Sequence, residues 1–481
     1  MAPPTVLPAA DRHLLERFSY GITPSLADEV RSAGSARAWF DRQLRGEVAE
    51  DGLVAAIPTW FPGLNNPPPT AALLAGGGAR SAYQSDTEVI ARTLARRLLS
   101  KRQVYERMVD WASNLLYVPA VSGRPFPWRS DFDENVIRPR ALGSYRALLQ
   151  AATVHPAMVV YLNGDQNARG AVNENHAREL LELHTVGRRA YRESDVKQLT
   201  RLLTGFTIDD RTTLYTCGYD PARHQTGTVR ILGFTHRNAD RDGRAAVRAF
   251  LDYAALHPAT ARRVATRLCQ RFVADEPDPA LVRHVAAAYL AARSDLPSTL
   301  RALVRHPAFA ASAGGLTRLP GDDVVRSARA LGLRPLGAGT GSLVHRLVSY
   351  AEDMGQVSYR WPAPDGWPER SRTYLGPARM LRGWQAHYEL TTVSSASGQA
   401  AVAPEPFTQL PDRWPVTLRA LVEQQTVLLL GRHASARLVD AVADVLGLRP
   451  GHLFTGPGQV DQRVYRLVRG TVLNDPSGVR R

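Results

Sequence analysis

Residues 173–187 hold the densest set of chemically capable side chains in the sequence, Asn-Glu-Asn-His-Ala-Arg-Glu-Leu-Leu-Glu-Leu-His-Thr-Val-Gly. The spacing of the leucines and the closing glycine predict one helix that ends at that glycine. At about 100° per residue, Asn175, Glu179 and Glu182 share one stripe of this helix, and His176 lies beside Glu179. Carboxylates and imidazoles are the side chains that most often transfer protons or bind metals, so we expect the functional site here.

Two orientations of this helix are open. A solvent-exposed helix normally carries Glu–Lys pairs opposite an apolar stripe, and here its main support would be an Arg178–Glu182 pair. A helix that lines a cleft would turn its carboxyl and imidazole groups inward, where charges persist only when they are paired or liganded. The stretch has polar groups on most faces and no lysine. We therefore predict the inward orientation.

One chemistry for such a helix is metal-dependent catalysis. Imidazole and carboxylate ligands suit Fe, Zn or Mn, and the candidate ligands are His176, Glu179 and His184. The spacing is not that of an HExxH motif, and His184 lies roughly 60° or more around the helix axis from the other two. We expect one ion to take Glu179 with His176, or His184 with a distant partner such as His224, rather than all three.

A second chemistry needs no metal. One of the two later glutamates would act as general acid or base with a raised pKa, and a histidine would relay the proton. Arginines would bind an anionic group on a small-molecule substrate by paired hydrogen bonds. The predicted catalytic residues are Glu179, Glu182, His184 and His224, and the predicted substrate-binding residues are Arg178, Asn175, Arg138 and Trp367.

A third interpretation is a binding or scaffold protein without turnover. The polar helix would then be a buried structural network of paired Glu, Arg and Asn groups that fixes helix packing. Other polar residues have simpler interpretations. His155, His257 and His306 each precede a proline at an expected helix start and are expected to cap it, and the Asp322–Asp323 pair is expected to be an ordinary helix cap rather than a Mg²⁺ site.

Composition narrows the class of protein. The chain has 481 residues and a formal net charge of +15, carried almost entirely by arginine. The arginines are scattered rather than gathered into a basic stripe, and no nucleic-acid-binding module is recognisable, so we expect no nucleic-acid partner. No run of 18 uncharged apolar residues predicts a membrane span. Two cysteines cannot form a disulfide framework, and the N-terminus lacks a secretory signal pattern, so we expect a cytoplasmic protein.

The pattern of helical segments predicts a mainly α-helical fold, with one domain over residues 1–481. Two stretches interrupt it. Residues 57–82 are rich in proline and glycine and are expected to form a flexible loop, and residues 207–234 are turn-rich with short extended runs and are expected to form a small β-hairpin insertion.

The sequence resembles a bacterial family, domain-of-unknown-function family 1800, over most of its length. The residues that carry the resemblance are NENHARELLELHTVG with RHLLERFSYGITPSLADEV, IRPRALGSYRALLQAATVHPAMVVYLNG, HQTGTVRILG, LHPATARRVATRLCQRFVAD, HPAF and PDGWP, in the family's order and spacing. The resemblance implies a mostly helical bacterial protein, often exported and encoded near a companion family. It implies no established reaction.

The departures from the family pattern also carry information. The family typically has Trp-His-Asn-His-Phe where this chain has Trp-Ala-Ser-Asn-Leu at 111–115, so two histidines are replaced by Ala112 and Asn114. Where the family has His-Asp followed by lysine, this chain continues from His224 with Gln-Thr-Gly. A family metal site that used those groups would have lost ligands. We therefore expect a divergent intracellular enzyme, with natural-product tailoring as one fitting task.

Overall fold

The computed structural model describes residues 6–76, 81–120, 123–209, 216–339, 341–393, 401–402 and 409–481. Helices dominate these residues, and strands occur only in short two-stranded sheets. This confirms the prediction of a mainly α-helical fold with small hairpins.

The chain begins with three short helices, α1 (Ala9–Phe18), α2 (Pro24–Ala33) and α3 (Ala36–Leu44). The Thr23 hydroxyl accepts a hydrogen bond from the Leu26 backbone N–H at 3.2 Å, and Ser35 caps α3 in the same way. Such caps satisfy backbone N–H groups that have no partner within the helix. Gly34, at φ 86°, ends α2 in the left-handed conformation.

The loop predicted over residues 57–82 is wrong for the residues that the structure describes. They contain the end of α4 (Gly52–Trp60), a 3₁₀ turn η1 (Pro62–Asn65) and α5 (Pro68–Gly76), while 77–80 lie outside the described ranges. The prediction takes each proline as a helix breaker. Proline is tolerated at the first position of a helix, because the backbone N–H that it lacks would have no partner within the helix there. Pro62 and Pro68 each occupy such a first position.

The middle of the chain is a series of helices. The two longer ones are α6 (Ala82–Leu99) and α7 (Gln103–Leu115). Shorter segments follow, namely α8 (Phe126–Asp131), the π-helical η2 (Phe132–Ile137), α9 (Arg138–Arg140), α10 (Tyr145–Thr153), α11 (Pro156–Tyr161), η3 (Gly164–Gln166), α12 (Asn175–Glu179), the π-helical η4 (Leu180–His184) and α13 (Glu193–Leu202).

The β insertion consists of two successive antiparallel hairpins rather than one. Strand β1 (Phe206–Asp209) pairs with β2 (Thr216–Tyr219), and β3 (Val229–Ile231) pairs with β4 (Phe234–His236). Leu232 and Gly233 connect the second pair, and both have positive φ, as the tightest hairpin turns require. Residues 210–215 of the predicted insertion lie outside the described ranges.

Helices also make up most of the remaining chain. They are α14 (Arg244–Ala255), α15 (Pro258–Phe272), α16 (Pro279–Ala291), α17 (Leu296–Arg305), α18 (Pro307–Ala311), α19 (Pro320–Ala330), α20 (Leu343–Asp353), η5 (Ser371–Tyr374), α21 (Pro377–Leu390), α22 (Leu418–Leu430), α23 (Ala436–Leu446), η6 (Pro457–Gln459), α24 (Gln462–Leu473) and α25 (Pro476–Val479). Two short pairs join β5 (Arg334–Pro335) to β6 (Ala401–Val402) and β7 (Val416–Thr417) to β8 (Leu453–Phe454).

The predicted histidine caps are confirmed. His155, His257 and His306 each accept a hydrogen bond from the backbone N–H two residues later, at 3.2, 3.1 and 3.2 Å. The interpretation of Asp322 as an ordinary cap is wrong. Its carboxylate lies in the first turn of α19 but is buried, and it is bound by the Arg107 guanidinium.

The buried apolar side chains form two clusters. One is built from α1–α3 with α7 and the helices from α10 to α18, and the other from α6 with α19, α20 and α22–α24. Buried ion pairs join the two, and we call Arg97, Arg107, Asp110, Arg271 and Asp322 the arginine seam. Arg107 donates to Asp322 at 2.6 Å, and Asp110 receives both Arg97 and Arg271.

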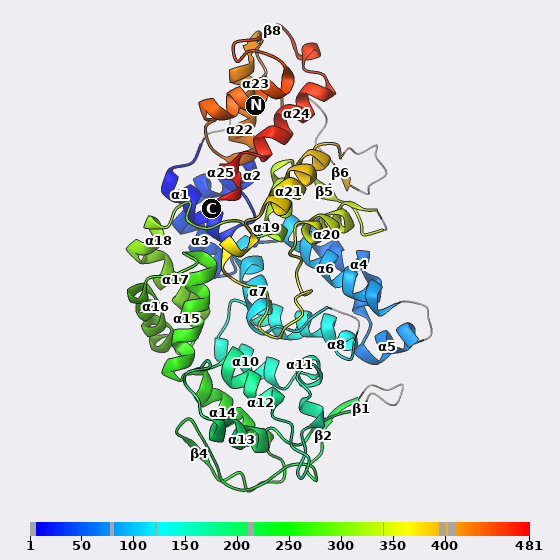
Figure 1. Ribbon diagram of the computed structural model, residues 1–481, viewed down its shortest axis with the longest axis vertical. Coiled ribbons are helices and arrows are strands. Elements are labelled where there is room, and N and C mark those ends of the chain that lie inside the picture. Colours follow the sequence, from blue (N-terminus) through cyan, green and yellow to red (C-terminus); the bar gives the residue numbers. More distant parts are fainter. Residues whose placement is uncertain are drawn as a thin grey trace.

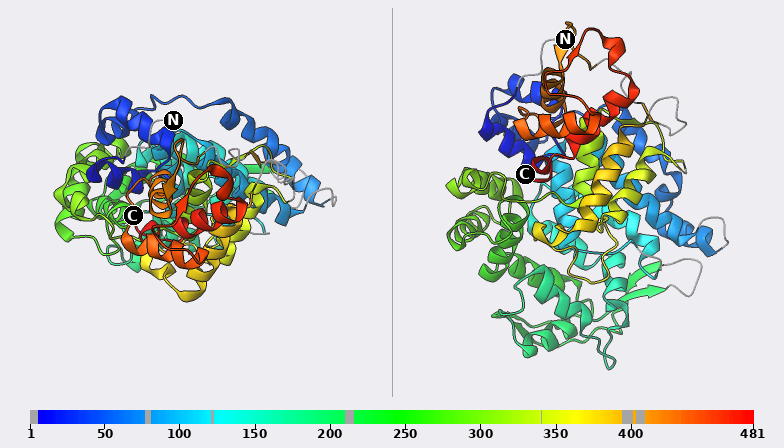
Figure 2. Two further views of the ribbon diagram at one scale, coloured as in Figure 1. Left: turned by 90° about the horizontal axis from the view of Figure 1, so that it is seen from above. Right: turned by 45° about the horizontal axis from the view of Figure 1, so that its top comes forward.

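The molecule is elongated in Figure 1, with α22–α24 at one end and the hairpins β1–β4 at the other. Figure 1 shows α12 and α13 at the hairpin end, away from the N-terminal helices, and the right panel of Figure 2 shows the same separation from a second direction. None of the helices in the described ranges combines the length and apolar character needed to cross a bilayer.

Candidate functional site

The predicted helix is present, but it changes type halfway. Residues 175–179 are α-helical, and 180–184 form a π-helical turn that ends before Gly187 at φ 85°. The Thr185 hydroxyl donates to the Leu180 carbonyl at 2.7 Å, and the Gly187 N–H donates to the Leu181 carbonyl at 2.9 Å. A π turn widens the helix and displaces the following side chains from their α-helical positions, and such turns are frequent at functional sites.

The two imidazoles of this helix point into the protein. His176 is 2% exposed and His184 is 3% exposed. Burial lowers the pKa of His176 to about 4. Burial, together with His176 and Arg263, lowers the pKa of His184 to about 3. Both rings are therefore neutral at physiological pH, because a buried imidazolium would lose its hydration.

These imidazoles make no side-chain hydrogen bond to any described residue, and the Nε2 of His176 is buried without a partner. His176 also packs closely on η3: a Cβ added to Gly164 would lie 2.7 Å from the His176 Nδ1 atom. The histidines therefore occupy a tight interior position rather than a proton-relay chain.

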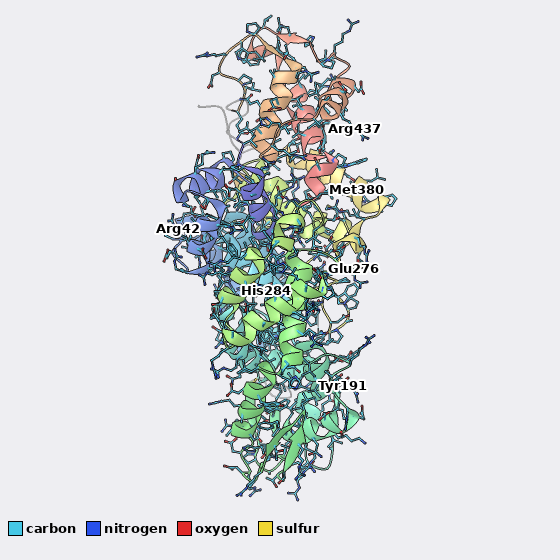
Figure 3. The ribbon with its side chains drawn as sticks, turned by 90° about the vertical axis from the view of Figure 1, so that its left-hand side faces the viewer. Arg42, Tyr191, Glu276, His284, Met380 and Arg437 are labelled. Carbon is cyan, nitrogen blue, oxygen red and sulfur yellow. The ribbon has the colours of Figure 1, made fainter. Side chains whose placement is uncertain are left out.

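Three charged groups of the same helix are held in ion pairs. Arg178 binds Glu174 at 2.9 Å and Glu193 at 2.6 Å. Glu182 binds Arg188 and accepts a hydrogen bond from the Tyr191 hydroxyl at 3.0 Å. The Arg178–Glu182 pair considered from the sequence is replaced by these pairs. Tyr191 is labelled in Figure 3, at the hairpin end of the molecule.

Glu179 differs from the other charged residues of the helix. Its side chain is half-buried and has no hydrogen bond or ion pair within the described residues. Burial raises the pKa of Glu179, and the negative charges of Glu182 and Asp365 raise it further, while Arg188 and Arg178 oppose them. A carboxyl with a raised pKa is better suited than an ordinary glutamate to exchange a proton with a substrate near neutral pH.

Two residues far apart in the sequence interact electrostatically with Glu179. Burial raises the pKa of Tyr161, at the end of α11, to about 12, and the charges of Glu179 and Asp365 add to the shift. Asp365 belongs to the Pro-Asp-Gly-Trp-Pro turn, where it accepts a hydrogen bond from the Trp361 indole at 2.8 Å. Glu179, Tyr161 and Asp365 form what we call the acidic site.

Trp367 belongs to the same turn and packs against Trp361. Its ring centroid lies 4.8 Å from that of Trp361, and its indole N–H donates to the Val357 carbonyl at 2.7 Å. Trp367 lines a cavity of about 20 Å³, together with Asp110, Ser113, Asn114 and Arg271. That volume suits only a group the size of one water molecule. Trp367 thus shapes the turn from within, and its predicted contact with substrate stays a prediction.

Asn114 occupies a position where the family resemblance expects histidine. Its side-chain amide donates to the Trp367 carbonyl at 2.9 Å and to Glu369 at 2.9 Å, and its side-chain oxygen accepts from the Trp367 N–H at 2.8 Å. An added Cβ on Gly366, at φ 71°, would meet the Asn114 carbonyl at 2.3 Å. Asn114 therefore fixes the turn that carries Asp365.

The structure does not bring the other predicted residues to the acidic site. His224 hydrogen-bonds to the Thr204 carbonyl and to Asn238, each at 3.0 Å, so it braces the loop between the hairpins. Arg138 is bound by both oxygens of Glu106, at 2.5 and 3.2 Å. Asn175 donates to the Leu162 carbonyl at 3.2 Å.

The proposed ligands also separate. His176 and His184 face the interior, whereas Glu179 faces Tyr161 and Asp365, so the three do not form a common ligand set. Over the described ranges, no group of three or more His, Cys, Asp and Glu side chains is arranged to hold a metal ion. His176 and His184 do not share a site with Glu179, because the helix directs the two imidazoles and the Glu179 carboxyl into different surroundings.

Sequence reasoning missed Tyr161 and undervalued Asp365. Neither has a local motif that marks it, because their relation to Glu179 exists only after α11 and the 361–368 turn pack beside α12. Asp365 did carry one signal, since it lies in a turn that belongs to the family resemblance.

Comparison with known proteins gives one match. A family model described as "Protein of unknown function (DUF1800)" matches residues 13–452. No curated protein and no solved structure matches the chain.

Proposed function

Starting from the premise that the chain belongs to the DUF1800 family, whose function is unknown, we propose that it is an acid–base enzyme with Glu179 as its proton-transfer group. One observation carries the proposal: Glu179 is the half-buried carboxyl of the signature helix that has a raised pKa and no bonded partner. The neighbouring carboxyls are placed differently, since Glu182 is held by Arg188 and Tyr191, and Asp365 by Trp361.

The neighbours of Glu179 suggest divided roles. Asp365 is exposed and remains available as a second carboxyl, which is the arrangement that lets one group act as acid and another as base or charge stabiliser. Tyr161 keeps its proton at neutral pH, so its hydroxyl can donate a hydrogen bond to a substrate oxygen.

The charge around the acidic site favours an uncharged or cationic small molecule. The arginines that were expected to bind an anionic group are occupied, Arg178 by two glutamates and Arg138 by Glu106. Glu179, Glu182 and Asp365 would together repel an anion. The substrate preference that we propose is therefore the reverse of the anionic one expected from the sequence.

A scaffold function receives less support from the same residues. A structural network stabilises a fold when each buried polar group has a partner. Here the His176 Nε2 atom and the Glu179 carboxyl have no hydrogen-bond partner among the described residues. This destabilises the folded protein, and a purely structural role would not require it.

Chemical labelling tests the state of Glu179 without knowledge of the substrate. Diazo reagents esterify protonated carboxyls, and peptide mass spectrometry locates the ester. Across about pH 4 to pH 7, Glu179 should be esterified before Glu174, which is the internal control because Arg178 holds its carboxylate. Equal labelling of the two residues would remove the basis of the proposal.

Turnover provides the second test. The protein is screened against chromogenic esters, amides and glycosides, and the substrate that responds is tested with Glu179→Gln and with the control Glu174→Gln. We expect Glu179→Gln to lower kcat by about 10²-fold or more, the usual contribution of a general acid or base. Unchanged turnover in a folded Glu179→Gln protein would exclude Glu179 from the mechanism.

A further inference from the structure

A second hollow, much larger than the cavity beside Trp367, shares no lining residue with the acidic site. It is a cleft of about 970 Å³, formed by the start of α2, by α3, by the 47–53 segment, by the turn between α6 and α7 and by the end of α19. That volume lies near the upper end of the roughly 300–1,000 Å³ typical of small-molecule sites. Figure 2 shows, in its left panel, the blue connection that runs from the N-terminal helices toward α4 along this part of the molecule.

Basic side chains converge in this cleft. Arg42, Lys101 and Arg329 all line it, and all three act electrostatically on the Glu29 carboxyl, so they share one region. Arg42 and Lys101 are exposed and have no ion pair within the described residues. Arg42 is labelled in Figure 3, on the blue N-terminal helices above Tyr191. Arg334 adds a fourth basic group to the lining.

Arg329 is half-buried, unlike the exposed Arg42 and Lys101. It donates to the Leu98 carbonyl at 2.6 Å, but its Nε–H is buried without a partner. Burial lowers the pKa of Arg329 to about 10, and the charges of Glu29 and Glu50 oppose this, so the group stays cationic at neutral pH. A buried donor without a partner is energetically unfavourable, and an incoming hydrogen-bond acceptor would remove that cost.

The acidic residues of the cleft are mostly engaged elsewhere. Asp28 binds Arg31, Glu47 binds Arg45, and Asp51 caps α4 by accepting from the Leu53 N–H at 3.1 Å. Glu50, just outside the lining, is bound by the Ser100 hydroxyl and the Lys101 backbone N–H. Glu29 and Asp51 are the acidic lining residues without an ion pair in the described ranges, so the four basic groups face two unpaired carboxyls, of which Asp51 is held as a helix cap.

We propose that this cleft binds a small multivalent anion that carries phosphate or carboxylate groups. The exposed side chains of Arg42 and Lys101 would bind the anion by charge, and the Arg329 Nε–H would donate a hydrogen bond to it. The hydroxyls of Thr23 and Ser25, at the N-terminal end of α2, line the same cleft and lie where backbone N–H groups favour negative charge. The inference does not depend on the acidic site, because the cleft and that site are formed by different residues.

Calorimetric titration of the full chain tests the proposal, with inorganic pyrophosphate and citrate as probes at matched ionic strength. We expect saturable binding of at least one probe with one site per chain. Pyrophosphate alone would identify a phosphate-bearing ligand, and citrate alone a carboxylate-bearing one. Absence of saturation by either probe at millimolar concentration would overturn the proposal.

Variants locate the binding. The double variant Arg42→Gln, Lys101→Gln should weaken binding by at least 10-fold. Its control is Arg189→Gln, Lys197→Gln, which makes the same charge change on exposed residues near the acidic site and uses the other lysine of the chain. Equal weakening by both doubles would mean that net charge alone attracts the anion and would contradict a site.

Two further variants sharpen the result. Glu29→Gln should tighten binding several-fold, because it removes the free negative charge that an anion would meet. Glu179→Gln should bind the probe as the wild type does, so failure of the catalytic proposal leaves this one testable. Weaker binding by a folded Glu29→Gln protein, as judged by its circular dichroism, would count against an anion in this cleft.

Discussion

The interior and the open face of the signature helix contain residues of similar chemical ability in opposite situations. His176 and His184 are buried and neutral, whereas Glu179 is half-exposed and has a raised pKa beside two other carboxyls. The π turn at 180–184 displaces Glu182 and His184 from the ordinary α-helical pattern, whereas His176 and Glu179 lie in the α-helical part before it. Residue type alone suggested one shared site, and the surroundings instead divide the helix into a packing face and a reactive face.

Lowering the pH should have the largest effect on stability, and this effect should come from the packing face of the helix. The native state keeps His176 and His184 neutral down to a pKa of about 4 and about 3, while the unfolded chain binds these protons near 6.5. Stability should therefore fall as the pH drops from 6.5 toward 4, by roughly 3 kcal/mol for each histidine at 1.36 kcal/mol per pKa unit.

Denaturant unfolding of wild type and His184→Gln across this pH range measures the effect. The variant cannot take up the proton in either state, so its stability should fall less steeply. His433→Gln is the matched control, because His433 is exposed beside Glu423 and should leave the slope almost unchanged. If the free energy of unfolding falls equally steeply with pH in the wild type and in the His184→Gln protein, the His184 side chain is not shielded from water.

A middle-sized effect should come from the packing contact itself. Gly164→Ala places a Cβ 2.7 Å from the His176 Nδ1 atom and 3.3 Å from Val159, and such overpacking typically costs about 1–3 kcal/mol. The loss should shrink when His176→Ala is added, since the smaller side chain relieves the contact.

The control for this prediction is Gly52→Ala at the start of α4, where an added Cβ meets nothing within 4 Å. Thermal melting of the two single variants and of the Gly164→Ala, His176→Ala double variant gives the comparison. A Gly164→Ala protein as stable as the Gly52→Ala protein would contradict close packing against His176.

The smallest effect should separate the two glutamates of the reactive face. Glu182→Gln loses the Arg188 and Tyr191 bonds and should lower stability slightly, in a way that added salt reduces. Glu179→Gln removes a desolvated carboxyl that has no bonded partner, so stability at pH 8 should stay level or rise. Denaturant midpoints at low and high salt distinguish them, and a larger loss for Glu179→Gln would mean that its carboxyl does have a structural partner.

Local features of the fold could be read from the sequence, because local chemistry determines them. His155, His257 and His306 cap helices as predicted, since each needs only its own backbone neighbours. The helix around Glu179 was also located correctly. The π turn is not predicted from the sequence, because placing Asn175, Glu179 and Glu182 on one stripe assumes an α-helix with a uniform rotation of about 100° per residue.

Features that depend on distant packing could not be read in the same way. Tyr161 and Asp365 acquire their relation to Glu179 only when three separate segments meet. His224 and Arg138 had the right chemistry for a site, but Thr204, Asn238 and Glu106 already satisfy them. The hidden Asp322 likewise gains its partner Arg107 from a helix more than 200 residues earlier in the chain.

The arginine seam has a consequence for how a substrate reaches the interior. Hinge bending between the two apolar clusters would pull Arg107 from Asp322 and Arg97 from Asp110 before water could replace these partners. Stranding a buried charge in this way costs about 3–5 kcal/mol per broken pair, so the clusters should move as a rigid unit. A visiting molecule must enter through a mouth that is already present, and turnover should owe more to loop and side-chain adjustments than to domain closure.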